Sequence, residues 1–260
     1  MSERSGSERG GSETELVLDD LHKAFPIDAG TLPVLAGVSL SVAPGEFVSV
    51  IGPSGCGKST LFNVIAGLER PDSGRVLVDG ADATGRTEPF AYMPQQDLLF
   101  PWRTVLDNTA LGLEVGGIKR RAARERARTL FAPFGLAGFE NARPHQLSGG
   151  MRQRAALLRT VVQDRPVLLL DEPFGALDSL TRLDMQSWLE GVRGHFGRTV
   201  LLITHDIREA VFLSDRVVVL GSRPTRVHED IPVDLPRPRG AEPQFAAGIE
   251  AELLAALRRR

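Results

Sequence analysis

A short apolar segment followed by a glycine-rich turn constrains the fold of this chain more than any other feature. Residues Phe47–Ile51 alternate β-branched side chains and predict a buried strand. The residues that follow, 52–60, match the pattern G-x-x-x-x-G-K-[ST], and apolar residues then recur at helical spacing. Strand, loop and helix therefore occur in the order that a phosphate-binding loop requires.

The residue types in this turn suit a triphosphate. Glycines let the backbone curl so that successive N–H groups point toward an anion, and the helix start adds its positive dipole end. Lys58 is expected to reach the β- and γ-phosphates, and the Ser59 hydroxyl to ligate Mg²⁺. The alternative is a glycine turn with a stray lysine, but the flanking strand and helix favour the phosphate site. We predict that a nucleoside triphosphate contacts Gly52, Pro53, Ser54, Gly55, Cys56, Gly57, Lys58, Ser59 and Thr60.

Length and composition indicate one large α/β domain, or one domain with a subdomain. Cys56 is the only cysteine, which excludes an intramolecular disulfide and fits a reducing compartment. No apolar run approaches the roughly 20 residues of a membrane-spanning helix. Residues 1–14 are rich in Ser, Gly, Glu and Arg, so we expect a disordered leader there and no signal peptide. The chain is therefore expected to be soluble and cytoplasmic.

Predicted strands and helices alternate on both sides of a helical block. Strands are expected at residues 15–18, 38–42, 75–80, 167–172, 200–205 and 217–220. Residues 104–160 have helical periodicity, with breaks expected at 112–117 and 133–144, so they are interpreted as a subdomain inserted between strands. Helices are also expected at 207–213 and about 245–257, and the prolines from residue 224 onward exclude regular helix between these two.

An arginine-rich stretch lies within the helical block. Residues 118–131 contain Arg120, Arg121, Arg124, Arg126 and Arg128. A nucleic-acid surface is one interpretation of such a run, but a solvated helix face is far more common. Because the formal net charge of −2 gives no global attraction to nucleic acid, we predict no nucleic-acid partner.

Polar residues at the ends of two later strands complete a candidate catalytic site. The carboxyl ends of parallel strands are where open α/β sheets place their chemistry. Asp171 ends one such strand and would hold Mg²⁺ through water, while Glu172 would polarise the attacking water. The alternative for adjacent acids is a solvent-facing turn. His205 ends another strand and either contacts the γ-phosphate or orients the water, although a strand-end histidine is usually a structural hydrogen bonder.

A second glycine turn opens another predicted helix. Ser148, Gly149 and Gly150 precede a helical run and offer free N–H groups at a helix start, which form an anion site. One nucleotide does not need two such sites from one chain. We therefore predict a dimer in which the second turn of each chain covers the nucleotide of the other.

The order of these motifs resembles the ATP-binding cassette (ABC) transporter ATPases. Leu-Ser-Gly-Gly-Met-Arg-Gln-Arg (147–154) stands between the phosphate loop and Leu-Leu-Leu-Asp-Glu-Pro (168–173), and the similarity covers about residues 15–221. The resemblance implies a transport-coupled ATPase that uses ATP and Mg²⁺. It also implies an α/β fold: a P-loop NTPase core with a mainly parallel sheet, an antiparallel β edge and an inserted helical subdomain.

The resemblance also implies roles for individual residues. Phe25 resembles the aromatic that stacks on adenine, and Gln95 the glutamine that joins the helical subdomain to Mg²⁺ and water. His205 resembles the switch histidine. Residues 175–178 (Gly-Ala-Leu-Asp) resemble the loop that contacts the partner in the dimer, with Gly175 where the family often has serine. The predicted catalytic residues are thus Glu172, His205 and Gln95, and the predicted metal ligands are Ser59, Gln95 and Asp171.

The resemblance narrows to one importer group. Met-Pro-Gln-Gln-Asp-Leu-Leu-Phe-Pro-Trp (93–102) is similar to nitrate, sulfonate and taurine importers, and residues 92–95 and 101–108 are also similar to ATPases of thiamine-pyrimidine-precursor importers. This implies a homodimer at the cytoplasmic face of the inner membrane, with an integral-membrane permease and, indirectly, a periplasmic or lipid-anchored solute-binding protein. The alternatives are the ATPase of an exporter or lipoprotein-release system and a soluble ABC ATPase.

The expected domain organisation follows from the same comparison. Residues 1–14 form a leader, 15–230 a nucleotide-binding domain with its helical subdomain at about 97–160, and 231–260 a Pro/Arg-rich tail. Within the subdomain, Leu98, Leu99, Phe100 and Trp102 cluster around Pro101. They are either ordinary core residues or an apolar groove that receives a helix of the permease.

Overall fold

The computed structural model describes residues 14–28, 30–175, 177–196, 198–237, 239 and 246–259, with the side chains of 192–196 left out. Residues 1–13 of the expected leader lie outside the described residues, whereas Thr14 is buried. In the part of the chain that the structure describes, no helix is long and apolar enough to span a membrane.

A four-stranded antiparallel sheet forms one flank of the molecule. It contains β1 (Leu16–Ile27), β2 (Gly30–Val42), β4 (Ser73–Val78) and β5 (Ala81–Asp82) in the order β2-β1-β4-β5. The first two strands are far longer than the apolar pattern predicts, because residues 22–27 and 30–36, beyond the predicted segments, pair as a hairpin. Pro33 lies inside β2, which is an edge strand with register shifts, where proline is tolerated.

The second sheet has six strands and carries the phosphate loop. Its strands are β3 (Phe47–Ile51), β6 (Phe90–Met93), β7 (Val167–Asp171), β8 (Thr199–Ile203), β9 (Arg216–Leu220) and β10 (Val227–Pro232), in the order β10-β9-β3-β8-β7-β6. All neighbours pair in parallel except β10 with β9. The expectation of a mainly parallel sheet with an antiparallel edge is confirmed. The sequence pattern did not reveal the short β6 or the polar edge strand β10, which crosses the expected boundary at residue 230.

Eight α-helices are present among the described residues. They are α1 (Lys58–Ile65), α2 (Val105–Thr109), α3 (Leu111–Val115), α4 (Arg120–Arg128), α5 (Gly149–Val161), α6 (Ser179–Phe196), α7 (Ile207–Leu213) and α8 (Ala246–Arg258), with a 3₁₀ turn at Pro144–Gln146. The break expected to begin at Gly112 is wrong, since α3 continues through it. Gly112 instead allows close approach: a Cβ there would lie 2.7 Å from the Gln163 side chain.

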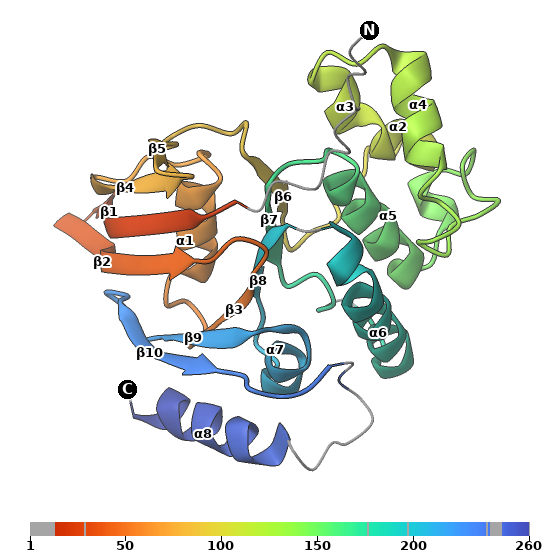
Figure 1. Cartoon of the computed structure of the whole chain (residues 1–260). Coiled ribbons are helices and arrows are strands. Elements are labelled where there is room, and N and C mark those ends of the chain that lie inside the picture. Colours follow the sequence, from red (N-terminus) through yellow and green to blue (C-terminus); the bar gives the residue numbers. More distant parts are fainter. Residues whose placement is uncertain are drawn as a thin grey trace, which may run out of the picture.

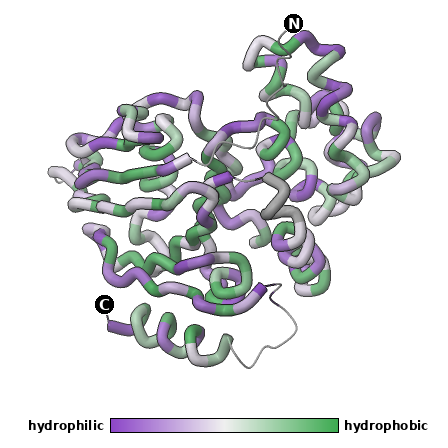
Figure 2. Tube along the Cα trace, in the orientation of Figure 1, coloured by the Kyte–Doolittle hydropathy of each residue, from purple (hydrophilic) through white to green (hydrophobic). Residues whose placement is uncertain are grey.

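The arginine-rich helix α4 is a charged face whose arginines are largely paired. Arg120 and Arg124 both contact Asp107, Arg126 contacts Asp164, and Arg128 contacts Glu125. Ala123 and Ala127 are its only buried residues, while Ala122 is exposed. The α4 segment accordingly shows strong purple colouring in Figure 2. Its charges therefore serve the packing of the helical subdomain.

The alternation of side chains along the strands divides the core into layers. In β8, Val200 and Leu202 face a cluster shared with α5 and the helical subdomain, whereas Leu201 and Ile203 face the antiparallel sheet and α1. A third cluster lies between β9, β10, α7 and α8. Figure 1 shows these layers, with α2, α3 and α4 projecting beyond α5 and with α8 lying along β10.

Candidate functional site

The strand order brings four predicted chain segments to one edge. Strands β3, β8, β7 and β6 lie side by side and run parallel, so their carboxyl ends meet at the same edge of the sheet. The phosphate loop follows β3 and His205 follows β8. Asp171 and Glu172 end β7, and Gln95 follows β6. These segments are spread over residues 52–205 of the sequence, and only the sheet places them together.

The phosphate loop has a backbone shape that requires glycine. Gly55 and Gly57 have φ values of 72° and 119°, in the left-handed region, and Gly57 is the residue before α1. A Cβ on Gly57 would lie 2.7 Å from Cγ1 of Val34, so the neighbouring strand packs directly on the loop. The Lys58 ammonium donates to the carbonyl oxygens of Gly52 and Pro53 at 2.9 and 3.0 Å. Lysine and loop thus form one compact unit.

Two residues outside any recognised sequence motif donate hydrogen bonds to the backbone of the phosphate loop. Arg223 donates to the Gly55 carbonyl, and the Thr225 hydroxyl donates to the Cys56 carbonyl. Both side chains come from the connection between β9 and β10. The Cys56 side chain itself is buried, in keeping with a packing role. A long-range hairpin contact of this kind leaves no local signal in the sequence.

Asp171 is a buried carboxyl beside the Ser59 hydroxyl. It is 4% exposed, its Oδ2 accepts from the Tyr92 hydroxyl at 3.5 Å, and it also hydrogen bonds with Ser59. Burial is the main cause that raises the pKa of Asp171 above its ordinary value. A buried carboxyl and a hydroxyl oxygen are ligands that suit Mg²⁺, which takes few protein ligands and completes its shell with phosphate and water. The residues present therefore fit the cation.

Glu172 is the point at which the predicted catalytic residues meet. Gln95 Nε2 donates to Glu172 Oε2 at 2.9 Å, and His205 Nδ1 lies 3.5 Å from Glu172 Oε1. Glu172 has a φ of 48°, an unusual backbone conformation for a residue with a side chain. Its N–H donates to the Ile203 carbonyl at 2.9 Å, which fixes the turn against β8. Strained backbone held by its surroundings is common at functional sites.

The signature turn, residues 148–150, lies apart from the phosphate loop of the same chain. Ser148 caps α5 by accepting from the Met151 N–H at 3.2 Å, and Ser148 and Gly149 are exposed. Across the described residues, no hydrogen bond or ion pair joins the signature turn to residues 52–60. The structure therefore brings the catalytic set together and leaves this predicted nucleotide-binding turn outside it.

Phe25 lies near the end of β1 and packs against the cluster that covers α1. Its ring is half-buried, and the Lys23 ammonium lies 5.1 Å from the ring centroid. β1 continues for two residues beyond Phe25 and ends at Ile27. The predicted stacking of Phe25 on adenine stays a prediction.

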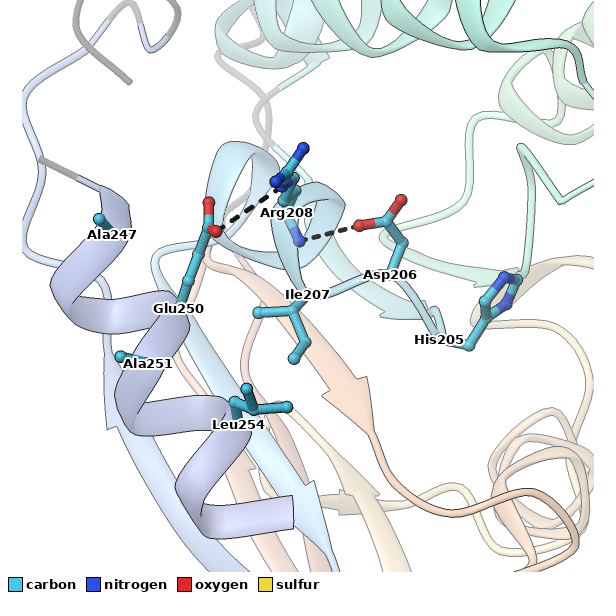
Figure 3. Close-up of a pocket in the computed structure, with 8 residues that line it drawn as sticks. All are labelled: His205, Asp206, Ile207, Arg208, Ala247, Glu250, Ala251 and Leu254. Carbon is cyan, nitrogen blue, oxygen red and sulfur yellow. Dashed lines mark hydrogen bonds and ion pairs between the residues drawn. The ribbon is translucent and has the colours of Figure 1, made fainter. Parts of the chain in front are cut away.

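A pocket of about 670 Å³ opens on the far side of His205. Figure 3 shows it between the start of α7, which supplies Asp206, Ile207 and Arg208, and one face of α8. Arg208 crosses it to Glu250, with Nε 3.7 Å from a carboxylate oxygen. The C-terminal helix therefore packs next to the segment that carries His205.

The fold and the site define an ATP-binding cassette ATPase. The family model described as "ABC transporter" matches residues 35–175, which is more than half of the chain. The chain belongs to this family. The resemblance stated from the motifs is confirmed, and so is the enzyme class, an ABC-type ATPase.

Particular relatives lie close in sequence. An aliphatic sulfonates import ATP-binding protein of Ralstonia nicotianae is 48% identical over 89% of this chain and 79% of its own. A taurine import ATP-binding protein of Pseudomonas savastanoi pv. phaseolicola is 44% identical over 92% of this chain and 88% of its own. Among solved structures, a dimeric bacterial ABC transporter cassette matches with a TM-score of 0.76 and 32% identity, covering 85% of this chain and 99% of its own.

Proposed function

We propose that two copies of this chain form a homodimer that hydrolyses ATP and powers the import of a small solute through an integral-membrane permease. The observation that carries the proposal is the convergence of Gln95 and His205 on the carboxylate of Glu172, next to the phosphate loop. ATP and Mg²⁺ are the cofactors that this arrangement suits.

Each side chain at the edge has a distinct part in hydrolysis. Lys58 and the loop N–H groups bind the phosphates, which orients the γ-phosphate without any covalent chemistry. Ser59 and Asp171, with Gln95, hold Mg²⁺, which supplies charge neutralisation when bound. Glu172 accepts a proton from the attacking water, and its hydrogen bond from Gln95 orients the carboxylate for this.

His205 and Phe25 complete the site in this proposal. His205 contacts the γ-phosphate or orients the water from the other side of Glu172, where its ring already lies 3.5 Å from the carboxylate. Phe25 presents a half-buried ring to adenine at the end of β1. Stacking on an aromatic ring is selective for a flat base and leaves the phosphates free to set the register.

The dimer is supported by the exposure of the signature turn. Ser148 and Gly149 face solvent at the start of α5, with N–H groups suited to an anion. In a homodimer these groups bind the nucleotide held by the Lys58 of the other chain. The solved relative that is dimeric supports the same assembly.

Coupling to a permease is supported by an exposed apolar patch beside Gln95, formed by Leu98, Phe100 and Trp102. These side chains are 56%, 36% and 66% exposed, while their neighbour Leu99 is buried and belongs to the core. The Phe100 and Trp102 ring centroids lie 5.2 Å apart, so these two rings form one apolar surface. An apolar surface of this kind suits a helix laid into a groove. The protein thereby binds peripherally at the cytoplasmic face of the inner membrane.

The solute belongs to the nitrate, sulfonate or taurine type. The relatives named for sulfonate and taurine import support this assignment, while the thiamine-pyrimidine-precursor branch rests on residues 92–95 and 101–108 alone. A periplasmic or lipid-anchored solute-binding protein delivers the solute to the permease. Uptake assays with each solute in proteoliposomes distinguish these substrates.

Hydrolysis is tested with Glu172→Gln, which keeps size and hydrogen bonding and removes the base. ATP binding should persist, while turnover should fall by about 10²–10⁴-fold, the usual contribution of a general base. The measurements are nucleotide affinity and steady-state phosphate release on the same preparation. A loss of less than several-fold would show that Glu172 is only an acid at a strand end.

Coupling is tested with Phe100→Asp in proteoliposomes that contain the permease. We expect ATP binding to remain and solute uptake to be lost while hydrolysis continues, because the introduced carboxylate disrupts the apolar contact with the permease. Leu99→Ala is the matched core variant and should lower stability instead. Wild-type uptake by folded Phe100→Asp would remove this patch from the coupling surface.

A further inference from the structure

Two residues that flank His205 are anchored to the rest of the chain. The buried Thr204 accepts from the Asp206 N–H through its hydroxyl at 3.0 Å, and the Asp206 carboxylate caps α7 by accepting from the Arg208 and Glu209 N–H groups at 2.9 and 3.3 Å. Figure 3 shows this cap and the adjacent His205. We call residues 204–209 the switch segment. The position of His205 therefore depends on what holds Asp206.

The other oxygen of Asp206 faces Arg182 on α6. Arg182 Nη1 lies 3.6 Å from Asp206 Oδ2, and Nη2 donates to the Leu177 carbonyl at 3.1 Å. Leu177 belongs to the contact loop, residues 175–178. A guanidinium presents its donors in a planar fork, so one side chain joins the contact loop to the switch segment.

A second bond connects the same two elements further along. Gln186, one turn after Arg182 on α6, donates to the buried Glu209 at 3.1 Å. Glu209 also hydrogen bonds with Thr204. The contact loop in turn packs against the signature turn, since a Cβ on Gly150 would lie 2.8 Å from the Thr181 methyl and 3.6 Å from Leu177. A continuous set of contacts runs from the signature turn to His205.

We propose that Arg182 is a positioning residue for ATP hydrolysis, which holds His205 beside Glu172 by tying the contact loop to the switch segment. The proposal rests on the proposed function. It accounts for the position of His205, whose side chain is 62% exposed and lies 3.5 Å from Glu172. Approach of a partner to the contact loop then acts on His205 through α6.

The test compares Arg182→Ala with Arg208→Ala, a matched control. Arg208 also pairs with a carboxylate, that of Glu250 on α8, and its side chain is 85% exposed. We expect Arg182→Ala to lower kcat by roughly 10- to 100-fold, the scale of a small misplacement of a reacting group. ATP affinity should stay within about twofold, and Arg208→Ala should match wild type. Near wild-type kcat in folded Arg182→Ala would overturn the proposal.

A double-mutant cycle separates positioning of His205 from general damage. If Arg182 acts through His205, Arg182→Ala should cause no further loss of kcat in a His205→Ala background, because the group it positions is gone. The same loss in both backgrounds would overturn the proposal. Should Arg182→Ala fail to fold, Asp206→Asn keeps the α7 cap and removes the charge that Arg182 contacts. It should lower kcat in the same way, and wild-type kcat would again contradict the proposal.

The same ATPase measurements distinguish failure of the proposed function from failure of the positioning role. If the wild-type chain releases no phosphate from ATP, the proposed function fails before Arg182 is tested. If the wild type hydrolyses ATP and the Arg182 variants do so equally well, only the positioning role is wrong.

Discussion

The two glycine turns of this chain differ in what surrounds them. The phosphate loop is enclosed by its own chain, with Val34 against Gly57 and with Arg223 and Thr225 behind it. The signature turn also opens a helix, but Gly149 is exposed, and a Cβ there would meet only the end of the Arg152 side chain. Similar local chemistry therefore has two purposes. One turn is completed within the chain, and the other is available to a second molecule.

The largest expected effect concerns the enclosed turn. Lys58→Ala removes the mobile positive charge at the phosphates, and a lost charge-assisted hydrogen bond lowers ATP affinity by about 10- to 100-fold. Lys119→Ala is the control, because Lys119 is exposed before α4. Equilibrium binding of labelled nucleotide measures both. Near wild-type binding and turnover in Lys58→Ala would contradict the phosphate-loop assignment.

The next prediction asks whether the exposed turn works on the partner's nucleotide. Each single variant, Lys58→Ala or Ser148→Arg, should be inactive. Their mixed dimer contains one site with both lesions and one with neither, so partial ATPase activity should return. Mixing Lys58→Ala with Glu172→Gln is the control, because every site then keeps one lesion. No recovery in demonstrated heterodimers means that the sites act only as a pair or that the turn does not act across the dimer.

A matched pair of substitutions tests the enclosure directly. Gly57→Ala places a methyl against Val34 at positive φ, and strain of this kind costs about 1–3 kcal/mol of unfolding free energy. Gly149→Ala makes only an ordinary contact with the Arg152 guanidinium at 3.9 Å and should change the unfolding free energy by less than about 1 kcal/mol. Its hydrolysis should nevertheless fall, because the partner's nucleotide approaches there. Denaturant unfolding and ATPase assays check both; equal destabilisation would contradict the comparison.

The last prediction concerns the buried carboxyl of Glu209, on α7. Burial raises the pKa of Glu209 from 4.5 to about 7. The folded state thus binds a proton more tightly, and this stabilisation is fully present below about pH 4.5 and is lost as the pH rises through about 7. Relative to Glu209→Gln, wild type should lose up to about 1.4 kcal/mol of unfolding free energy per pH unit. Parallel pH profiles would show that Glu209 does not titrate in this range.

Local sequence patterns predicted the phosphate loop, the strand-end acids and the class of protein. The glycine pattern at 52–60, the apolar strand before Asp171 and Glu172, and the turn at Ser148 each combine a period with turn chemistry that a single segment specifies. The class of protein and the mainly parallel sheet followed from these motifs and their order. The long hairpin of β1 and β2, the strands β6 and β10, and the role of Gly112 did not, because each depends on pairing or packing with residues far away in the sequence.

The tertiary structure decided how these parts combine. Gln95 and His205 reach Glu172 only because β6, β7 and β8 are neighbours with parallel register. The contacts of Arg223 with the phosphate loop and of Arg182 with Asp206 join segments that are far apart in the sequence, so no local sequence pattern predicts them. A sequence motif records which groups a reaction needs. The distances between those groups are set by strand order and side-chain packing, which are properties of the whole fold.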